Sequence, residues 1–415
     1  MDGMLRRLGF LFALVGLLVA LSVTSAGAAT WGKDTLDGPA GIASGQTPNT
    51  AGQHTSTVLF QSLPHVFYYE VVPAAGLVPA TGHLRHAWWN GSAWSAETLD
   101  GDATNVASGK IKQNVGGYTS ATLFGGLPHV FYYNFSANDL RHGWWDGAAW
   151  HFETLDGKTA VPTPNPPTGQ TSDDVGQYSS VTLFGGLPHV WYYDNSFKEL
   201  RHAWWDGVQW SFERLDGNGG STPNVGQYSS VTLFGGLPHV FYYDASGKKL
   251  RHAWWTGVQW SFEALDGPSV PGGNGRSPTG VGQFTSVTLF GGMPHVFYYR
   301  ASTLTVPNGD LRHAWWDGAQ WRFETLDGGG LAGPSVGQYT ATTLVDGLPH
   351  VWYYDATNGG LRHASWSGLA WVFETVDVAT PPGVGQFTSV TLFGGQPHVF
   401  YYDAANLDLR HAWLG

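Results

Sequence analysis

The chain lacks cysteine entirely and carries little charge. None of the 415 residues is cysteine, and only 12% are charged. Without disulfides, an exported chain must take its stability from packing and from closure of its fold. The net charge of −11 argues against a nucleic-acid partner, because phosphate binding needs a basic patch.

Long apolar runs are also missing, except at the N-terminus. Arg6 and Arg7 precede an apolar run from Leu8 to Val23, and Ala26-Gly27-Ala28 offers a small-residue cleavage site. This pattern predicts a signal peptide over residues 1–28 and a secreted mature chain over 29–415. A retained N-terminal anchor is the alternative. No other run is long enough to insert in a membrane.

Aromatic residues and glycines are plentiful, and they occur in a repeat. The 58 glycines and 15% aromatics are typical of an all-β protein with many tight turns. Copies of one pattern can be aligned on a Pro-His pair, and they are 48 to 64 residues apart. The seven histidines of these pairs are His65, His129, His189, His239, His295, His350 and His398.

One repeat, Gly226–Gly267, divides into four short strands. "SSVTLF" ends at the turn Gly235-Gly236, and "PHVFYY" ends in a polar loop. "LRHAWW" ends at Thr256-Gly257, and "WSFEAL" ends at Asp266-Gly267. Seven four-stranded antiparallel units spaced in this way predict a β-propeller.

The two ends of the chain support the same prediction. The last copy stops after its third strand, at Leu409–Gly415, and "WGKDTLDG" at residues 31–38 matches the missing fourth strand. We therefore expect an all-β, seven-bladed propeller over residues 29–415. The segment 31–38 would form the outer strand of the last blade and close the ring, which removes open sheet edges.

Alternation along the strands predicts which side chains share a face. Pairing the hairpins symmetrically places His239 opposite His252, and a shift of two would keep both on one face. That mixed face carries Thr232, His239, Phe241, Tyr243, His252, Trp254 and Glu263. The other face is apolar apart from Arg251 and carries Val231, Leu233, Val240, Tyr242, Ala253, Trp255, Trp260 and Phe262.

The polar positions of the mixed face recur in the other blades. The third-strand histidines are His86, His142, His202, His252, His313, His363 and His411. The tryptophans that follow them are Trp88, Trp144, Trp204, Trp254, Trp315 and Trp413, with Ser365 in the sixth blade. The outer-strand acids are Glu97, Glu153, Glu213, Glu263, Glu324 and Glu374, with Asp34 in the closing strand.

A groove lined by indole, imidazole and carboxylate groups suits a neutral sugar. The flat ring covers an apolar sugar face, and the polar groups bond hydroxyls. We expect such sites between blades, built from both histidines, the tryptophan and the glutamate of one blade, with an arginine such as Arg251 and aromatics of the neighbour. Several weak sites on one ring would gain avidity on a glycan surface. Ser365 should make the sixth groove the weakest.

The motif "HVFYYD…LRHAWWDG..W" resembles the blade motif of β-propeller lectins, namely fungal fucose-binding lectins and their bacterial seven-bladed relatives. The similarity covers the mature chain seven times over. It implies a multivalent lectin that binds glycans without catalysis or cofactor. In that family an arginine on the second strand and a glutamate on the third hold the sugar. Those positions correspond here to His239 and His252 and their copies, so the resemblance implies sugar binding but not fucose specificity.

Four other interpretations stay open. The histidines can be purely structural, satisfying polar groups between sheets. Two histidines and a carboxylate could hold a metal, although we expect none. The protein could be a propeller lyase or glycosidase, but a catalytic site is normally one asymmetric group of residues, which sevenfold repetition does not suggest. A protein-interaction propeller is the last alternative. The oligomeric state is not predicted.

Overall fold

The computed structural model describes residues 30–76, 79–105, 107–160, 169–220, 223–271, 275–303, 308–329, 333–378 and 383–415. The predicted signal peptide, residues 1–28, lies outside the described residues. Every regular element in the described ranges is a β-strand. These ranges hold no helix that is long and apolar enough to cross a membrane.

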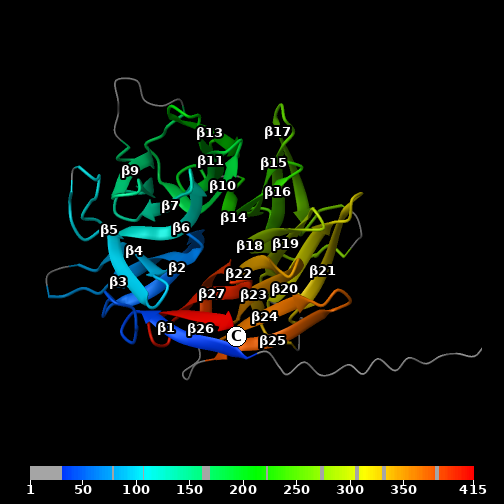
Figure 1. The fold of residues 1–415 in the computed structure, drawn as a ribbon. Coiled ribbons are helices and arrows are strands. Elements are labelled where there is room, and N and C mark those ends of the chain that lie inside the picture. The colour runs from blue at the N-terminus through cyan, green and yellow to red at the C-terminus, as the bar shows by residue number, and fades with distance from the viewer. Residues whose placement is uncertain are drawn as a thin grey trace, which may run out of the picture. The chain divides into compact units, whose positions relative to one another are not determined.

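Twenty-eight strands form seven four-stranded antiparallel sheets (Figure 1). The innermost strands are β2 (Thr50–Phe60), β6 (Val115–Phe124), β10 (Val175–Phe184), β14 (Val225–Phe234), β18 (Val281–Phe290), β22 (Val336–Val345) and β26 (Val384–Phe393). The second strands are β3 (Leu63–Val72), β7 (Leu127–Asn134), β11 (Leu187–Asp194), β15 (Leu237–Asp244), β19 (Met293–Arg300), β23 (Leu348–Asp355) and β27 (Gln396–Asp403). The third strands are β4 (Thr81–Trp89), β8 (Asp139–Trp145), β12 (Glu199–Trp205), β16 (Lys249–Trp255), β20 (Asp310–Trp316), β24 (Gly360–Trp366) and β28 (Asp408–Leu414). The outer strands are β5 (Trp94–Asp100), β9 (Trp150–Gly157), β13 (Trp210–Asp216), β17 (Trp260–Asp266), β21 (Trp321–Asp327), β25 (Trp371–Val378) and β1 (Trp31–Asp37).

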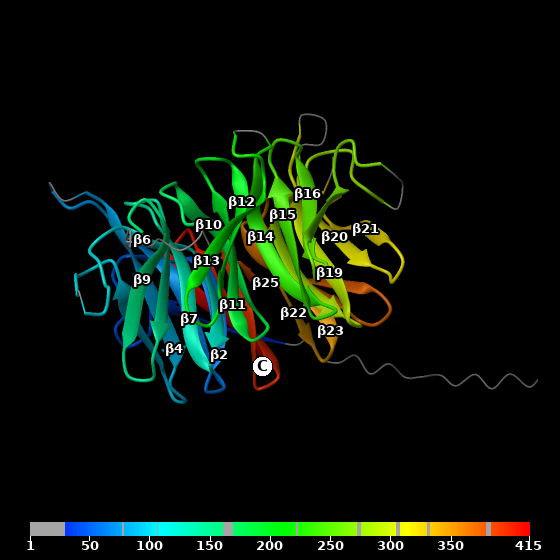
Figure 2. The ribbon, with the colours of Figure 1, turned by 90° about the horizontal axis from the view of Figure 1, so that it is seen from above.

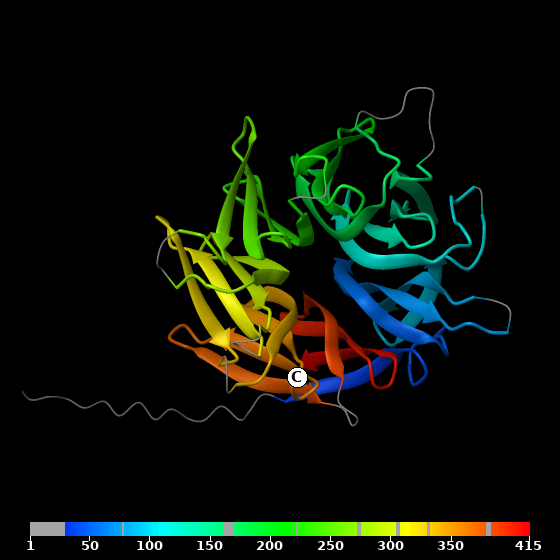
Figure 3. The same ribbon diagram turned by 180° about the vertical axis from the view of Figure 1, so that it is seen from behind.

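Each sheet is one blade, and we number the blades 1 to 7 from β2 onward. Each innermost strand contacts the innermost strands of the two adjacent blades, and β26 contacts β2, so the ring is closed (Figures 2 and 3). Strand β1 pairs with β28, where Trp31 lies opposite Leu414. The seven-bladed fold and its closure by the N-terminal strand are therefore confirmed.

Strand pairing confirms the two faces and corrects one register. Thr232 lies opposite His239, as expected, and His252 lies opposite Glu263. His239, however, lies opposite Trp254 rather than His252. The shift is two residues, because the turn between β15 and β16 occupies residues 245–248 and pairs Asp244 with Lys249. Both histidines stay on the mixed face.

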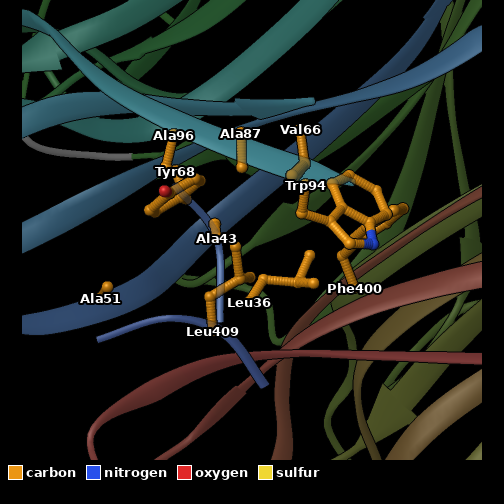
Figure 4. Packing of buried hydrophobic residues seen from close by; sticks show 10 residues of the cluster. All are labelled: Leu36, Ala43, Ala51, Val66, Tyr68, Ala87, Trp94, Ala96, Phe400 and Leu409. Carbon is orange, nitrogen blue, oxygen red and sulfur yellow. The ribbon is translucent and has the colours of Figure 1, made fainter. Parts of the chain in front are cut away.

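The apolar face of each blade packs on the mixed face of the preceding blade. One such core lies where the ring closes, and Trp94 of β5 meets Phe400 of β27 edge-on at 5.6 Å between ring centroids. Figure 4 shows the two rings in contact, with Leu36 and Leu409 nearby. All four side chains are almost fully buried. Burying a large apolar side chain stabilises the fold by about 1.5–3 kcal/mol, so these interfaces are the main source of stability.

The arginines that precede the third-strand histidines hold neighbouring blades together. Arg251 Nε lies 3.0 Å from Asp216 Oδ2, at the end of the preceding outer strand, and Nη2 lies 2.9 Å from the same oxygen. In the next blade Arg312 Nε and the Tyr298 hydroxyl both donate to Asp266 Oδ2, at 3.1 and 2.6 Å. A buried carboxylate needs such partners. The arginines are therefore committed to these ion pairs.

A ring of aromatic side chains narrows the central channel. Seven residues of the innermost strands, each with a φ of 52–54°, line a cavity of about 200 Å³: His54, Tyr118, Tyr178, Tyr228, Phe284, Tyr339 and Phe387. Neighbouring ring centroids are 4.5–4.7 Å apart all the way round. Left-handed backbone costs a non-glycine residue on the order of 1–3 kcal/mol. Contacts between the tilted rings, whose planes meet at 47–54°, offset this cost.

Candidate functional site

A groove opens between adjacent blades at the turn between their first two strands. Between blades 3 and 4 it has a volume of about 260 Å³. Blade 3 lines it with the mixed-face residues Phe184, His189, His202, Trp204 and Glu213. Blade 4 lines it with Pro238, Trp255 and Trp260. We call these spaces the inter-blade grooves and number each by the blade that supplies its histidines.

Grooves 2 and 7 have the same construction. Their volumes are about 280 and 310 Å³. Groove 2 is lined by Phe124, His129, His142, Trp144, Glu153, Pro188, Trp205 and Trp210. Groove 7 is lined by Asp34, Pro64, Trp89, Trp94, Phe393, His398, His411 and Trp413. The repeat in the sequence thus appears in the structure as similar grooves beside blades 2, 3 and 7.

The two histidines and the acid of each blade form a linear hydrogen-bonded chain. In blade 4 the Glu263 Oε1 atom lies 2.9 Å from His252 Nδ1, and His252 Nε2 lies 2.9 Å from His239 Nδ1. The histidine–histidine contact is 2.8–2.9 Å in every blade. The acid–histidine contact is 2.8–3.1 Å, with Asp34 as the acid in blade 7. We call this arrangement the Glu–His–His chain.

The acid sets the tautomer of both imidazoles. A carboxylate only accepts, so His252 donates from Nδ1 and leaves its Nε2 unprotonated. His239 must then donate from Nδ1, and its own Nε2 becomes an acceptor without a partner among the described residues. The Glu–His–His chain therefore ends at the groove in His239 Nε2, which can only accept a hydrogen bond.

Burial keeps these imidazoles neutral. Loss of solvent, with a smaller effect of the adjacent His252, lowers the pKa of His239 to about 3. The pKa of His252 is also lowered by burial, and the bond to Glu263 opposes that shift. Each ring of the Glu–His–His chain donates from Nδ1 and accepts at Nε2, and only a neutral imidazole can do both.

Aromatic rings form the walls of the groove. His202 stacks between Trp191 and Trp204, with centroids at 4.7 and 5.0 Å. Trp260 of the next blade meets His202 edge-on at 5.7 Å and donates its indole N–H to Glu213 Oε1 at 3.2 Å. The acid is therefore held from both blades while its side chain stays 37% exposed.

The structure brings most of the predicted site residues together but divides their roles. The third-strand histidines are buried, and both nitrogens of each ring are already bonded. They can orient the first histidine but offer no free atom to a ligand. The expectation that Arg251 faces the groove is wrong, because its guanidinium is paired with Asp216. The tryptophan pair of the following blade, such as Trp255 and Trp260, was expected only as unnamed aromatics.

Groove 6 has lost aromatic walls at three positions. Val345 stands where other innermost strands end in phenylalanine, and Ser365 stands where Trp254 lies in blade 4. Leu414, opposite Trp31, takes the place of a third ring from the next blade. The Glu–His–His chain is intact there, because Glu374, which also accepts from Trp31, lies 2.8 Å from His363. Groove 6 therefore keeps its polar end and lacks part of its apolar walls.

A larger cavity adjoins groove 2. It has a volume of about 700 Å³ and shares Glu153, Trp205 and Trp210 with the groove. It continues outward past Phe152 and the linker glycine Gly109. A chain of more than one sugar unit would have room to extend here.

The polar groups are not arranged to hold a metal ion. No group of three or more histidine, aspartate or glutamate side chains in the described part of the chain could ligate one. In the Glu–His–His chain the groups bond one another in a line, as in Glu263 to His252 to His239, whereas ligands must converge on a point.

Comparison with known proteins gives similarity of fold only. No family model matches the chain, and no curated protein matches it. Among solved structures, the SapL1 lectin in complex with α-methyl fucoside is 17% identical, with a TM-score of 0.41 over 79% of this chain and 95% of that one. The six-bladed Aleuria aurantia lectin is 16% identical, with a TM-score of 0.45 over 79% and 96%. The GH93 α-L-arabinofuranosidase of Fusarium graminearum is 10% identical, with a TM-score of 0.48 over 71% and 92%. At these values the similarity carries no argument about function.

Proposed function

We propose that the protein is a secreted, multivalent lectin that binds neutral sugars in its inter-blade grooves. The observation that carries the proposal is the groove itself, in which tryptophans line both walls and the Glu–His–His chain ends in a free imidazole nitrogen. Aromatic faces cover the apolar face of a pyranose, while acceptors take its hydroxyl protons. Repetition around a rigid ring supplies valence.

The charge of the groove supports neutral rather than acidic sugars. The free polar atoms are acceptors, such as His189 Nε2 and the exposed carboxylate of Glu213. No lysine or arginine lines grooves 2, 3 or 7. A sugar carboxylate would lie beside the glutamate without a cation, which disfavours its binding.

A glycan array tests this proposal. The protein is applied at high density to neutral and sialylated or uronate-containing glycans. We expect binding to a subset of neutral glycans and little to acidic ones. No binding to any glycan would refute the lectin proposal.

An enzyme that cleaves polysaccharides is the second candidate. Only the geometry of the Glu–His–His chain favours it, because a carboxylate-oriented imidazole of fixed tautomer is placed as a general base would be. The lowered pKa of His189, about 3, makes that imidazole a weak base and disfavours the enzyme. Incubation with soluble polysaccharides and measurement of new reducing ends separates the candidates. Turnover that is lost in a His189→Gln variant would favour the enzyme, whereas binding without turnover favours the lectin.

A further inference from the structure

The outer strands differ in whether a linker covers their free edge. In blades 1, 2, 3 and 5 the linker that enters the blade runs along the outer strand. In blade 1, Ser44 N–H donates to Trp94 O at 3.0 Å, and Ala96 N–H donates to Ser44 O at 2.7 Å. In blade 2, Phe152 N–H donates to Ser108 O at 2.6 Å. The linker acts as a short fifth strand.

In blades 1 and 2 a glycine follows the paired linker residue, and in blades 3 and 5 a linker glycine lies against the outer strand in the same way. Its carbonyl accepts from the Nη2 of the blade's arginine at 2.6–2.9 Å, in the pairs Arg85–Gly45, Arg141–Gly109, Arg201–Gly169 and Arg312–Gly275. Two residues after the glycine, a backbone N–H donates to Oδ1 of the aspartate at the end of the preceding blade's outer strand. The pairs are Thr47–Asp37, Ile111–Asp100, Thr171–Asp156 and Ser277–Asp266. Four linkers of 12 to 17 residues thus make the same contacts.

Only glycine fits the central position of this covering segment. The four glycines have φ between +75° and +84°. A Cβ on Gly45 would lie 2.2 Å from Ala96 O, and one on Gly109 would lie 1.8 Å from Phe152 O. From this glycine onward the described residues read Gly-Gln-Thr, Gly-Lys-Ile, Gly-Gln-Thr and Gly-Arg-Ser, and a paired serine precedes the glycine in blades 1 and 2. The chain therefore supplies a pattern for such a segment, serine followed by glycine.

Blades 4 and 6 carry the same receiving surface, and no linker residue among those described makes these covering contacts with it. Phe262 and Phe373 are 39% and 38% exposed, whereas the phenylalanines at this position in blades 2, 3 and 5 are only 3–6% exposed. The Arg251 and Arg362 side chains are 22% and 20% exposed, against 3–7% for the four covered arginines. Covering therefore explains the burial in the four sister blades.

Blade 7 shows how an uncovered edge can be protected. There Lys33 occupies the phenylalanine position, and its Nζ lies 3.3 Å from Asp377 Oδ1, the atom that takes the linker N–H elsewhere. A lysine on an edge strand blocks pairing with other chains. Blades 4 and 6 have no such lysine.

We propose that the outer edges of blades 4 and 6 bind an extended segment of a partner protein that contains serine followed by glycine, as the covering linkers of blades 1 and 2 do. The segment would add a strand beside Phe262 or Phe373, place its glycine carbonyl on Arg251 or Arg362, and donate an N–H to Asp216 or Asp327. Addition of a strand to a free sheet edge is a general mode of peptide recognition. Phe262 and Phe373 are not among the lining residues of grooves 2, 3 or 7, and the proposal does not depend on sugar binding.

The chain supplies its own probe. A labelled peptide with the sequence of residues 42–48, Ile-Ala-Ser-Gly-Gln-Thr-Pro, is titrated with the full chain and followed by fluorescence anisotropy. We expect saturable binding at two sites per chain. The same peptide with its glycine replaced, Gly45→Ala, should bind at least ~10-fold more weakly, since one blocked backbone contact is worth about that factor.

A matched protein variant locates the site. Phe262→Lys combined with Phe373→Lys introduces the residue that blade 7 carries at this position, so the fold tolerates it. We expect peptide binding to be lost and binding to a glycan surface to be unchanged. Absence of saturable peptide binding, equal binding of the alanine peptide, or unchanged binding to the lysine variant would overturn the proposal. A wild-type dimer that the lysine variant abolishes would also overturn it, because a second copy would then occupy the edges.

Discussion

The third-strand histidine and the acid of each blade together determine the tautomer of the first histidine at the groove. His189 could donate or accept at Nε2, and Glu213 acting through His202 fixes it as an acceptor. The carboxylate thus acts on a ligand directly at its exposed edge and indirectly through two rings. An account of specificity at this site has to treat the three side chains as one unit.

Burial of the first histidines predicts that the protein loses stability in acid. Their pKa falls from 6.5 to about 3 or 4 on folding, because burial penalises the charged ring. Between those values the unfolded chain binds protons that the folded chain excludes, so the free energy of unfolding decreases as pH falls from about 6.5 towards 3. Thermal midpoints measured from pH 7.5 to 4 should fall steadily. A triple variant with glutamine for His129, His189 and His239 should show a shallower slope, and an unchanged slope would contradict this assignment.

Two histidines of one blade should differ in their contribution to stability. His202 is buried, stacked on both sides and bonded at both nitrogens, so His202→Ala should cost about 2–3 kcal/mol. His189→Ala removes a ring that ends at the groove and should cost less than about 1.5 kcal/mol. Chemical denaturation of both variants checks the order. Equal losses would mean that both rings are structural to the same degree.

The sequence predicted which side chains share a face but not what they bond. Alternation places His239, His252 and Glu263 on one face both in the symmetric register and after a shift of two, and this was correct. Register decides the pairs, and a shift of two puts Trp254 rather than His252 opposite His239. The role of Arg251 depends on Asp216, which lies 35 residues earlier in another blade. No pattern within one repeat contains that contact.

At the scale of strands and linkers, the seven repeats are not equivalent. Groove 6 lacks aromatic walls from Val345, Ser365 and Leu414, and blades 4 and 6 lack a covering linker. The sequence indicated the first difference through Ser365 alone. The other two changes lie on different strands, and Leu414 belongs to the next blade, so they emerge only when the blades are assembled.

Groove 6 should be the defective sugar site, and its repair should be measurable. Ser365→Trp combined with Leu414→Trp restores two rings above an intact Glu–His–His chain. Titration calorimetry with a monovalent sugar should detect six equivalent sites in the wild-type chain and seven in this variant. As a matched control, Trp254→Ser copies the natural change into blade 4 and should reduce six sites to five. An unchanged site number in the control would contradict the role given to the tryptophans.

At the scale of the whole molecule, stability depends on closure of the ring by β1. This strand supplies buried Leu36, the Trp31 ring beside Trp352, and the acid Asp34 of groove 7. Its place was predictable because the N-terminal "WGKDTLDG" completes a pattern that the C-terminus leaves unfinished.

Removal of β1 should destabilise the whole propeller rather than one blade. Deletion of residues 1–37 exposes the edge of β28 and opens two grooves, so the thermal midpoint should fall by roughly 10 °C or more. The shortened protein should also self-associate in size-exclusion chromatography, because an open edge pairs with other chains. Deletion of residues 1–29 is the control and should leave the midpoint unchanged. A 1–37 deletion that melts like the control would contradict the closure argument.

The central claim is that one groove design, repeated around the ring, binds a neutral sugar. The most direct test is the number of sugar molecules bound per chain, measured by titration calorimetry with the monovalent sugar selected on a glycan array. We expect six sites per chain of similar affinity, with unchanged binding between pH 8 and 5 because the first histidines, which face the ligand, stay neutral in that range. A single site per chain, or no heat of binding at all, would contradict the account.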